Sequence, residues 1–302
     1  MNVHRYLLML LLLPAVACAE PTTDCPASDG VSLQVLGSGG PIADDARAST
    51  GYLVWINGRA RAMIDAGGGT FLRFGEAGAK FTDLEIIAIS HFHTDHSADL
   101  PALLKSGYFT DRSEPLVVSG PNGDPPFPGL LEFTDEMLNG AYAYLGGYLD
   151  GSGGLPKLER VEVSGDEVAQ VLQHDSLGVE ALHVPHGIVP ALAYRVTAGG
   201  KTIVFSSDQN GNDEAFVEFS RDADVLVMHM PVPLGVSGAG RALHAPPDVI
   251  GQIANDADVE TLLLSHFMGR SLRNLHENLA AIDGRFSGEI VLANDLECLL
   301  VN

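Results

Sequence analysis

The sequence predicts an α/β fold, an αββα sandwich of two mixed β-sheets with helices on both outer faces. Three observations lead to this prediction. The 302 residues are few enough to share one core. Strand patterns occur in two successive groups, each followed by helical patterns. Glycine and proline, with 34 and 17 residues, separate the strands as in an ordered protein with many turns.

The first strand group occupies residues 31–89. Segments 31–36, 51–56 and 61–64 are rich in β-branched and aromatic side chains, which predicts an N-terminal meander. Segment 84–89 is a continuous apolar run, as expected of a strand buried on both faces. A helix is expected at 100–109. The second group comprises strands 178–184, 191–196, 201–206, 224–228, 260–264 and 289–292, with helices near 247–254 and 274–282.

Residues 119–157, between the two groups, are rich in Gly and Pro and carry several aromatic side chains. We expect an insertion in the domain that contains a short helix. Such a segment can form a lid over a substrate site. Packing against the body of the domain is an equally good interpretation.

Residues 1–19 differ from the rest and are expected to be a cleaved signal peptide, which leaves a domain of residues 20–302. His4 and Arg5 precede an apolar run and a small-x-small cleavage site that ends at Ala19. The run is too short for a transmembrane span, which needs about 20 residues. We therefore expect a periplasmic or secreted protein. The stretch before Cys18 also resembles a lipobox, so a lipid anchor at Cys18 is the alternative.

Cleavage after Ala19 would leave two cysteines, Cys25 and Cys298. Such pairs persist as disulfides in an oxidising compartment, and the two ends of a domain often lie close together. We expect a disulfide between them. The alternative is that Cys298 is a buried apolar residue and Cys25 a free thiol. No spacing of a cysteine metal site is present in the sequence.

The formal charge of −22 arises from 39 acidic and 17 basic residues. A long nucleic acid is held through its phosphates by many Lys and Arg side chains. The charge therefore disfavours a long nucleic acid and favours a small-molecule substrate. The same net negative charge would also arise if the acidic side chains only kept the protein in solution. Nothing in the sequence indicates the oligomeric state.

The strongest chemical signal is His91-Phe92-His93-Thr94-Asp95-His96, which directly follows the buried strand. His91 and His93, two residues apart in an extended segment, face the same side. Asp95 and His96 follow where the chain turns toward the next helix, so they can serve a second metal ion. Imidazole nitrogens and carboxylate oxygens suit zinc, which at catalytic sites keeps a position open for water.

This segment resembles the His-x-His-x-Asp-His signature of the metallo-β-lactamase superfamily. The resemblance implies the αββα sandwich and three further ligands at strand ends, for which His186, Asp208 and His266 stand in the right order. His183 could replace His186, but only His186 precedes a Pro-x-x-x-Tyr-Arg strand. The resemblance implies two zinc ions per chain, one held by His91, His93 and His186, the other by Asp95, His96 and His266, with Asp208 bridging them.

The similarity covers residues 31 to 266 and most resembles the ribonuclease Z and phosphodiesterase branch, with matching motifs at 36–41, 47–52 and 64–67. His244 occupies the place where that branch has a histidine that assists the leaving group. Two departures are present. His229 lacks the acidic residue expected after it, so both metal-ligand support and simple packing remain open for His229. The insertion is acidic, which argues against transfer-RNA processing.

The expected function is an exported binuclear zinc hydrolase of a small phosphodiester or related ester, acting by attack of a metal-bridging hydroxide. Metal binding lowers the pKa of water toward about 7. Asp95 would orient the hydroxide, and His244, if protonated, would donate to the leaving oxygen. Asp208 as a bridge favours phosphodiester, lactone and thioester hydrolases over true β-lactamases. The second possible function is that of a lactonase or β-lactam hydrolase. The third is that of a catalytically weak metal-binding or interaction protein.

Overall fold

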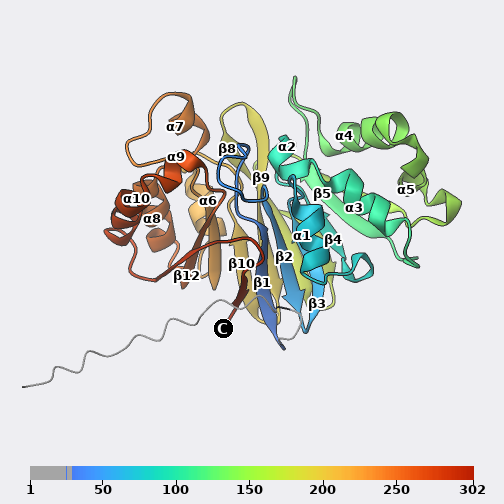
Figure 1. Ribbon diagram of the computed structural model, residues 1–302, viewed down its shortest axis with the longest axis horizontal. Coiled ribbons are helices and arrows are strands. Elements are labelled where there is room, and N and C mark those ends of the chain that lie inside the picture. Colours follow the sequence, from blue (N-terminus) through green and yellow to red (C-terminus); the bar gives the residue numbers. More distant parts are fainter. Residues whose placement is uncertain (1–24, 26–28) are drawn as a thin grey trace, which may run out of the picture.

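Two β-sheets packed face to face form the centre of the molecule, as the computed structural model of Cys25 and residues 29–302 shows (Figure 1). Within those residues each sheet has seven strands. The first has the order β14 (Cys298–Leu300), β1 (Val31–Gly37), β2 (Gly51–Ile56), β3 (Arg59–Ile64), β4 (Ile86–Ala88), β5 (Leu116–Pro121) and β6 (Leu158–Val163). The second has the order β13 (Glu289–Leu292), β12 (Thr261–Ser265), β11 (Val225–His229), β10 (Lys201–Phe205), β9 (Val189–Ala198), β8 (Leu177–His186) and β7 (Ala169–His174).

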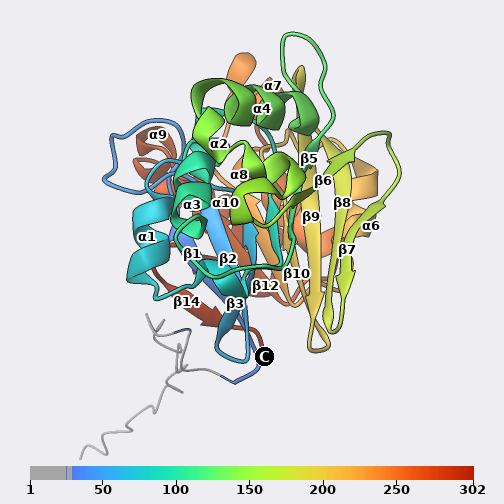
Figure 2. The same ribbon diagram turned by 90° about the vertical axis from the view of Figure 1, so that its right-hand side faces the viewer.

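Helices form the two outer layers (Figure 1, Figure 2). On the first sheet lie α1 (Thr70–Glu76), α3 (Leu100–Gly107), α4 (Leu130–Glu136) and α5 (Gly147–Asp150). On the second lie α6 (Glu214–Phe219), α8 (Pro247–Asp256) and α10 (Leu275–Asp283). The short helices α2 (Thr94–Ser97), α7 (Ala239–Leu243) and α9 (Gly269–Leu272) lie at one end of the sandwich. The predicted αββα sandwich is confirmed.

Both sheets are mixed, because antiparallel hairpins continue into parallel strands. The β2–β3 hairpin turns at Asn57-Gly58, both with positive φ, as a two-residue turn of this type requires. Successive side chains of a strand point to opposite faces. Tyr52 and Val54 accordingly enter the core between the sheets, whereas Leu53 packs under the outer helices. Burial on both faces explains the nearly continuous apolar strands.

The segment between β5 and β6 is more helical than the single short helix expected there. Besides α4 and α5 it contains η3 (Met137–Ala141), η4 (Ala143–Leu145), and η5 (Ser152–Gly154), while η2 (Phe81–Asp83) precedes β4. Leu138 and Tyr148 are fully buried against the first sheet, and the Tyr148 hydroxyl donates to the Leu104 carbonyl at 2.8 Å. The helical part of the segment therefore packs against the body of the domain.

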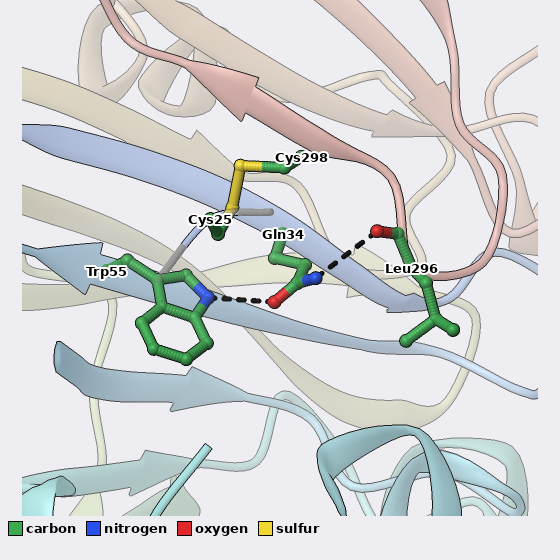
Figure 3. The surroundings of a disulfide bond; sticks show 5 residues. All are labelled: Cys25, Gln34, Trp55, Leu296 and Cys298. Carbon is green, nitrogen blue, oxygen red and sulfur yellow. Dashed lines mark hydrogen bonds between the residues drawn. A yellow bond between two sulfur atoms is a disulfide. The ribbon is translucent and has the colours of Figure 1, made fainter. Parts of the chain in front are cut away.

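A disulfide joins Cys25 to Cys298 of β14, with the two Cα atoms 5.5 Å apart, so the expected pairing is confirmed (Figure 3). Beside it, the Trp55 indole donates to the Gln34 side chain at 2.9 Å, and Gln34 donates to the Leu296 carbonyl at 3.2 Å. These bonds tie β1 and β2 to the C-terminal segment. The disulfide therefore lies at the β14 edge of the first sheet and joins Cys25 to the last strand.

The predictions for the extreme N-terminus, the signal peptide at residues 1–19 and the lipid anchor at Cys18, lie outside the described residues. No helix in the described part of the chain is long and apolar enough to cross a membrane.

Candidate metal centre

The residues expected to bind metal meet at one end of the sandwich, where strands of both sheets end. His91, His93, Asp95 and His96 follow β4 of the first sheet, while His186, Asp208 and His266 lie at or just after the ends of β8, β10 and β12 of the second. Two of these strands turn sharply, because Ser207 and His266 have positive φ, which is unusual for residues other than glycine. The two sheets together therefore build the site, and residues of α2, α7 and α9 line the cavity over it. These three helices lie at the same end of the sandwich (Figure 1).

One group consists of His91, His93 and His186, with one nitrogen of each within 4.8 Å of the others. His91 Nε2 and His93 Nδ1 are 3.0 Å apart. Two nitrogens that bind one tetrahedral zinc ion at about 2.0–2.1 Å are about 3.3 Å apart. The spacing therefore suits a shared metal ion.

A second group forms around His96 and His266, whose Nε2 atoms are 3.2 Å apart. Asp95 Oδ2 lies 3.2 Å from His266 Nε2 and 3.5 Å from His96 Nε2. Asp208 lies between the groups, with Oδ2 3.7 Å from His96 Nε2 and 3.8 Å from His186 Nε2. A single carboxylate thus reaches both groups, which is the geometry that a bridging ligand requires.

Neighbouring polar groups orient these imidazoles. His186 Nδ1 donates to the Leu243 carbonyl at 2.9 Å, so its Nε2 keeps a lone pair. His96 Nδ1 lies 2.8 Å from Asp65 Oδ2, a carboxylate–histidine pair of the kind that supports metal ligands. Both rings are therefore fixed with Nε2 toward the centre.

His229 contacts the centre through Asp208. Its Nδ1 lies 2.8 Å from Asp208 Oδ1, and its Nε2 lies 3.1 Å from the Tyr52 hydroxyl. All three side chains are buried. Of the two interpretations left open by the sequence, support of Asp208 fits these contacts better than simple packing. His183 lies apart from both groups and contacts the Val163 carbonyl instead.

One buried atom, Nε2 of His186, indicates that these side chains can hold a zinc ion. His186 Nε2 is fully buried and has no hydrogen-bond partner among the described residues. A buried polar atom without a partner is costly, and this one faces Asp208 and the other imidazoles. A cation bound by imidazole and carboxylate would satisfy it.

The electrostatics favour the protonation states that metal ligands need at His91 and Asp208, but they keep a proton on His96. Burial lowers the pKa of His91 well below its usual value, and His96 lowers it further. Burial opposes the charge on His96, but Asp65 raises the pKa of His96 well above the usual value. For Asp208, burial opposes ionisation, but His266 holds the pKa of that carboxyl well below its usual range. An ionised carboxylate and a neutral imidazole are thus already present, whereas His96 must release a proton when it binds a metal ion.

His244 lies next to this centre, after α7. Its Nδ1 is buried without a hydrogen-bond partner among the described residues and lies 3.9 Å from Asp208 Oδ1. Its ring centroid is 5.3 Å from that of His186. Burial lowers the pKa of His244 to about 4, against the opposing effect of Asp208. The imidazole is therefore uncharged at neutral pH.

A cavity of about 600 Å³ opens over the centre. Its lining includes the expected His93, Asp95, His186, Asp208, His244 and His266, together with Phe92, Phe127, Leu243, Met268 and Arg270. Phe127 is one of the aromatic residues of segment 119–157, which the sequence offered as a possible lid over a substrate site. Sequence reasoning missed Arg270, and it also missed Asp65 and Tyr52 as supports. Asp65 lies in a motif noted in the sequence, but its partner His96 is 31 positions away.

Comparisons with known proteins give the family of the chain and support its fold. The family model described as the β-lactamase superfamily domain matches residues 61–267. A ribonuclease Z of Methanosarcina acetivorans is 27% identical, covering 87% of this chain and 96% of that protein. The metallo-β-lactamase fold protein YhfI from Bacillus subtilis is 23% identical, with a TM-score of 0.69 over 90% of this chain and 100% of that one. Human tRNase Z, short form, is 18% identical, with a TM-score of 0.70 over 90% and 99%.

Proposed function

This chain belongs to the metallo-β-lactamase superfamily as a hydrolase related to ribonuclease Z, and we propose that it hydrolyses a small phosphodiester or related ester with two zinc ions. The observation that carries the proposal is the position of Asp208 between two groups of ligand atoms. His91, His93 and His186 would hold one zinc ion, Asp95, His96 and His266 the other, and Asp208 would bridge them.

Two zinc ions, when bound, lower the pKa of a water molecule toward about 7 and hold the group under attack, which supplies a nucleophile at neutral pH. Asp95 lines the cavity, so its carboxylate can accept a hydrogen bond from the attacking water. His244 lines the same cavity and is uncharged in the protein alone. It would donate an N–H hydrogen bond to the leaving oxygen, and a negatively charged substrate would raise its pKa toward full proton donation.

The size of the site favours a small substrate. Pockets for small molecules measure about 300–1,000 Å³, and this cavity of about 600 Å³ lies within that range. The net charge of −22 opposes a polyanion. A transfer-RNA precursor is the second candidate, because the relative from Methanosarcina acetivorans is named ribonuclease Z.

The decisive experiment measures zinc content together with turnover. We expect about two zinc equivalents and hydrolysis of bis(p-nitrophenyl) phosphate, with slower or no hydrolysis of a lactone, a β-lactam and a transfer-RNA precursor. Asp208→Ala should lose metal and activity together. Asp224→Ala is the matched control, because Asp224 pairs with Lys201 away from the site. Full activity after removal of metal would refute the mechanism. Two bound zinc ions without turnover would indicate a binding protein.

We also propose that the protein is exported, as the sequence of residues 1–19 predicts. The Cys25–Cys298 disulfide supports this, because disulfides persist in oxidising compartments. Cell fractionation and the mass of the mature chain test it. A mature chain that begins after Ala19 is expected, an acylated Cys18 would identify a lipoprotein, and an uncleaved chain in the cytoplasm would refute export.

A further inference from the structure

We propose that the substrate carries one negative charge and one flat ring, and that Arg270 and Phe127 recognise these two features. The inference rests on the proposed phosphodiester hydrolysis, and it names the class of substrate: a small aryl or nucleoside phosphodiester. Phe127 and Arg270 both line the cavity over the metal centre.

Phe127 is presented to the cavity by a closed turn between β5 and α4. Asp124 and Phe127 exchange two backbone hydrogen bonds, at 3.1 and 2.9 Å. The turn is narrow at its base, because a Cβ on Gly123 would lie 2.6 Å from the Gly129 nitrogen. These contacts constrain the backbone of the turn that carries Phe127, although Asp124 and its neighbours are exposed.

The ring of Phe127 has no role in the hydrophobic core. Phe127 belongs to neither of the two hydrophobic clusters of the described residues. Its ring instead lies 6.2 Å from the ring of His93, at the edge of the first ligand group. A partly exposed aromatic ring beside a reaction centre offers a surface on which a flat group can stack.

Arg270 lies within α9, four positions after His266 of the second ligand group. Its Nε donates to the Pro231 carbonyl at 2.9 Å, which fixes the guanidinium at the cavity. No ion pair of Arg270 occurs within residues 29–302, although the chain has 39 acidic residues. A positive charge that the fold leaves unpaired is suited to an anionic oxygen of a phosphodiester.

The two residues thus define complementary contacts around the metal centre. A phosphodiester carries a single negative charge at neutral pH, which one arginine can match. A ring carried by one of the two substituents on phosphorus would extend toward His93 and stack on Phe127. A neutral lactone lacks the negative charge that Arg270 would contact, and an alkyl ester lacks the ring that would stack on Phe127.

The test measures binding to the zinc-loaded protein by calorimetry with two monoanions, methyl phenylphosphonate and methyl methylphosphonate. Both have the same charge, but only the first has a ring. We expect the wild type to bind the phenyl compound about tenfold more tightly, since stacking on an aromatic side chain contributes about 1–3 kcal/mol and 1.4 kcal/mol is tenfold. Phe127→Ala should abolish this preference without weakening binding of the methyl compound. Arg270→Gln should weaken both about equally.

Two variants serve as matched controls. Phe109 is 75% exposed and lies outside the cavity, and Arg273 is an exposed arginine one turn after Arg270. Phe109→Ala and Arg273→Gln should leave both dissociation constants unchanged. Zinc content and Tm of every variant show whether the centre is intact, and Phe127→Leu replaces Phe127→Ala if that variant unfolds.

The outcomes separate this inference from the proposed function. Equal binding of the two phosphonates by the wild type, or an unchanged preference in Phe127→Ala, would overturn the role of Phe127. Unchanged binding in Arg270→Gln would overturn that of Arg270. Turnover of bis(p-nitrophenyl) phosphate by the wild type tests the proposed function separately, so either can fail while the other stands.

Discussion

Replacing Asp65 with Asn should weaken zinc binding although Asp65 is not expected to touch the metal. Asp65 is buried, and its Oδ2 accepts from His96 Nδ1 at 2.8 Å and from the Ser90 hydroxyl at 2.9 Å. Its Oδ1 accepts from the Ser90 backbone N–H at 2.7 Å. All of these partners are donors, so a carboxylate satisfies them and an amide cannot.

In either orientation of its amide, an asparagine at position 65 cannot accept all of these hydrogen bonds. If the amide oxygen faces Ser90 N–H, the NH2 group faces His96 Nδ1 and favours the tautomer with its proton on Nε2, the atom that faces His266. If the oxygen faces His96, the NH2 group meets the Ser90 N–H, and a buried donor loses its acceptor. The positive φ of Asp65 is tolerated by asparagine, so the backbone should not change.

Loss of a group that supports a metal ligand costs about 10- to 100-fold in metal affinity, which is about 1.4–2.8 kcal/mol. Zinc dissociation constants measured by competition with a chromophoric chelator should rise by this factor in Asp65→Asn. Asp224→Asn is the control, because Asp224 also accepts a backbone N–H, from Thr202 at 2.7 Å, but lies away from the centre. Wild-type affinity in Asp65→Asn, or an equal loss in Asp224→Asn, would refute the reasoning.

Three further perturbations test other parts of the structure. His244→Ala should retain both zinc ions but lower kcat by about 10²–10⁴; the loss should shrink for substrates with very good leaving groups, whereas loss of zinc would identify His244 as a ligand. Reducing the Cys25–Cys298 disulfide should lower the free energy of unfolding by up to about 5 kcal/mol, because the bond closes a very long loop and so restricts the unfolded chain. An unchanged midpoint of denaturant unfolding would contradict this. Gly67→Ala should lower both Tm and zinc affinity, because the added Cβ would lie 2.1 Å from the backbone oxygen of Asp95. Gly75→Ala is the control and should be neutral or stabilising, because its Cβ would meet nothing within 4 Å. Equal effects of the two substitutions on Tm would disprove the argument.

The strands with apolar sequences were predictable, including the edge strand β13, whereas the edge strands with charged or polar sequences were not. Segments such as 51–56 and 289–292 were placed at their observed bounds. β6 and β7 were missed, because each is the outermost strand of its sheet and carries charged or polar side chains. Such side chains protect an edge strand from pairing with other chains, and they also make its sequence resemble a loop.

The sequence alone determined the candidate ligands, because each lies next to a buried strand whose hydrophobic pattern is local. His91, His93 and His96 could be assigned from six consecutive residues, and a strand that ends at a sheet edge delivers its ligand there. Contacts between distant positions depend on how the two sheets pack, and no local pattern encodes that packing. Only the tertiary structure could therefore place Asp65 against His96 and bring Phe127 and Arg270, from distant parts of the sequence, to one cavity.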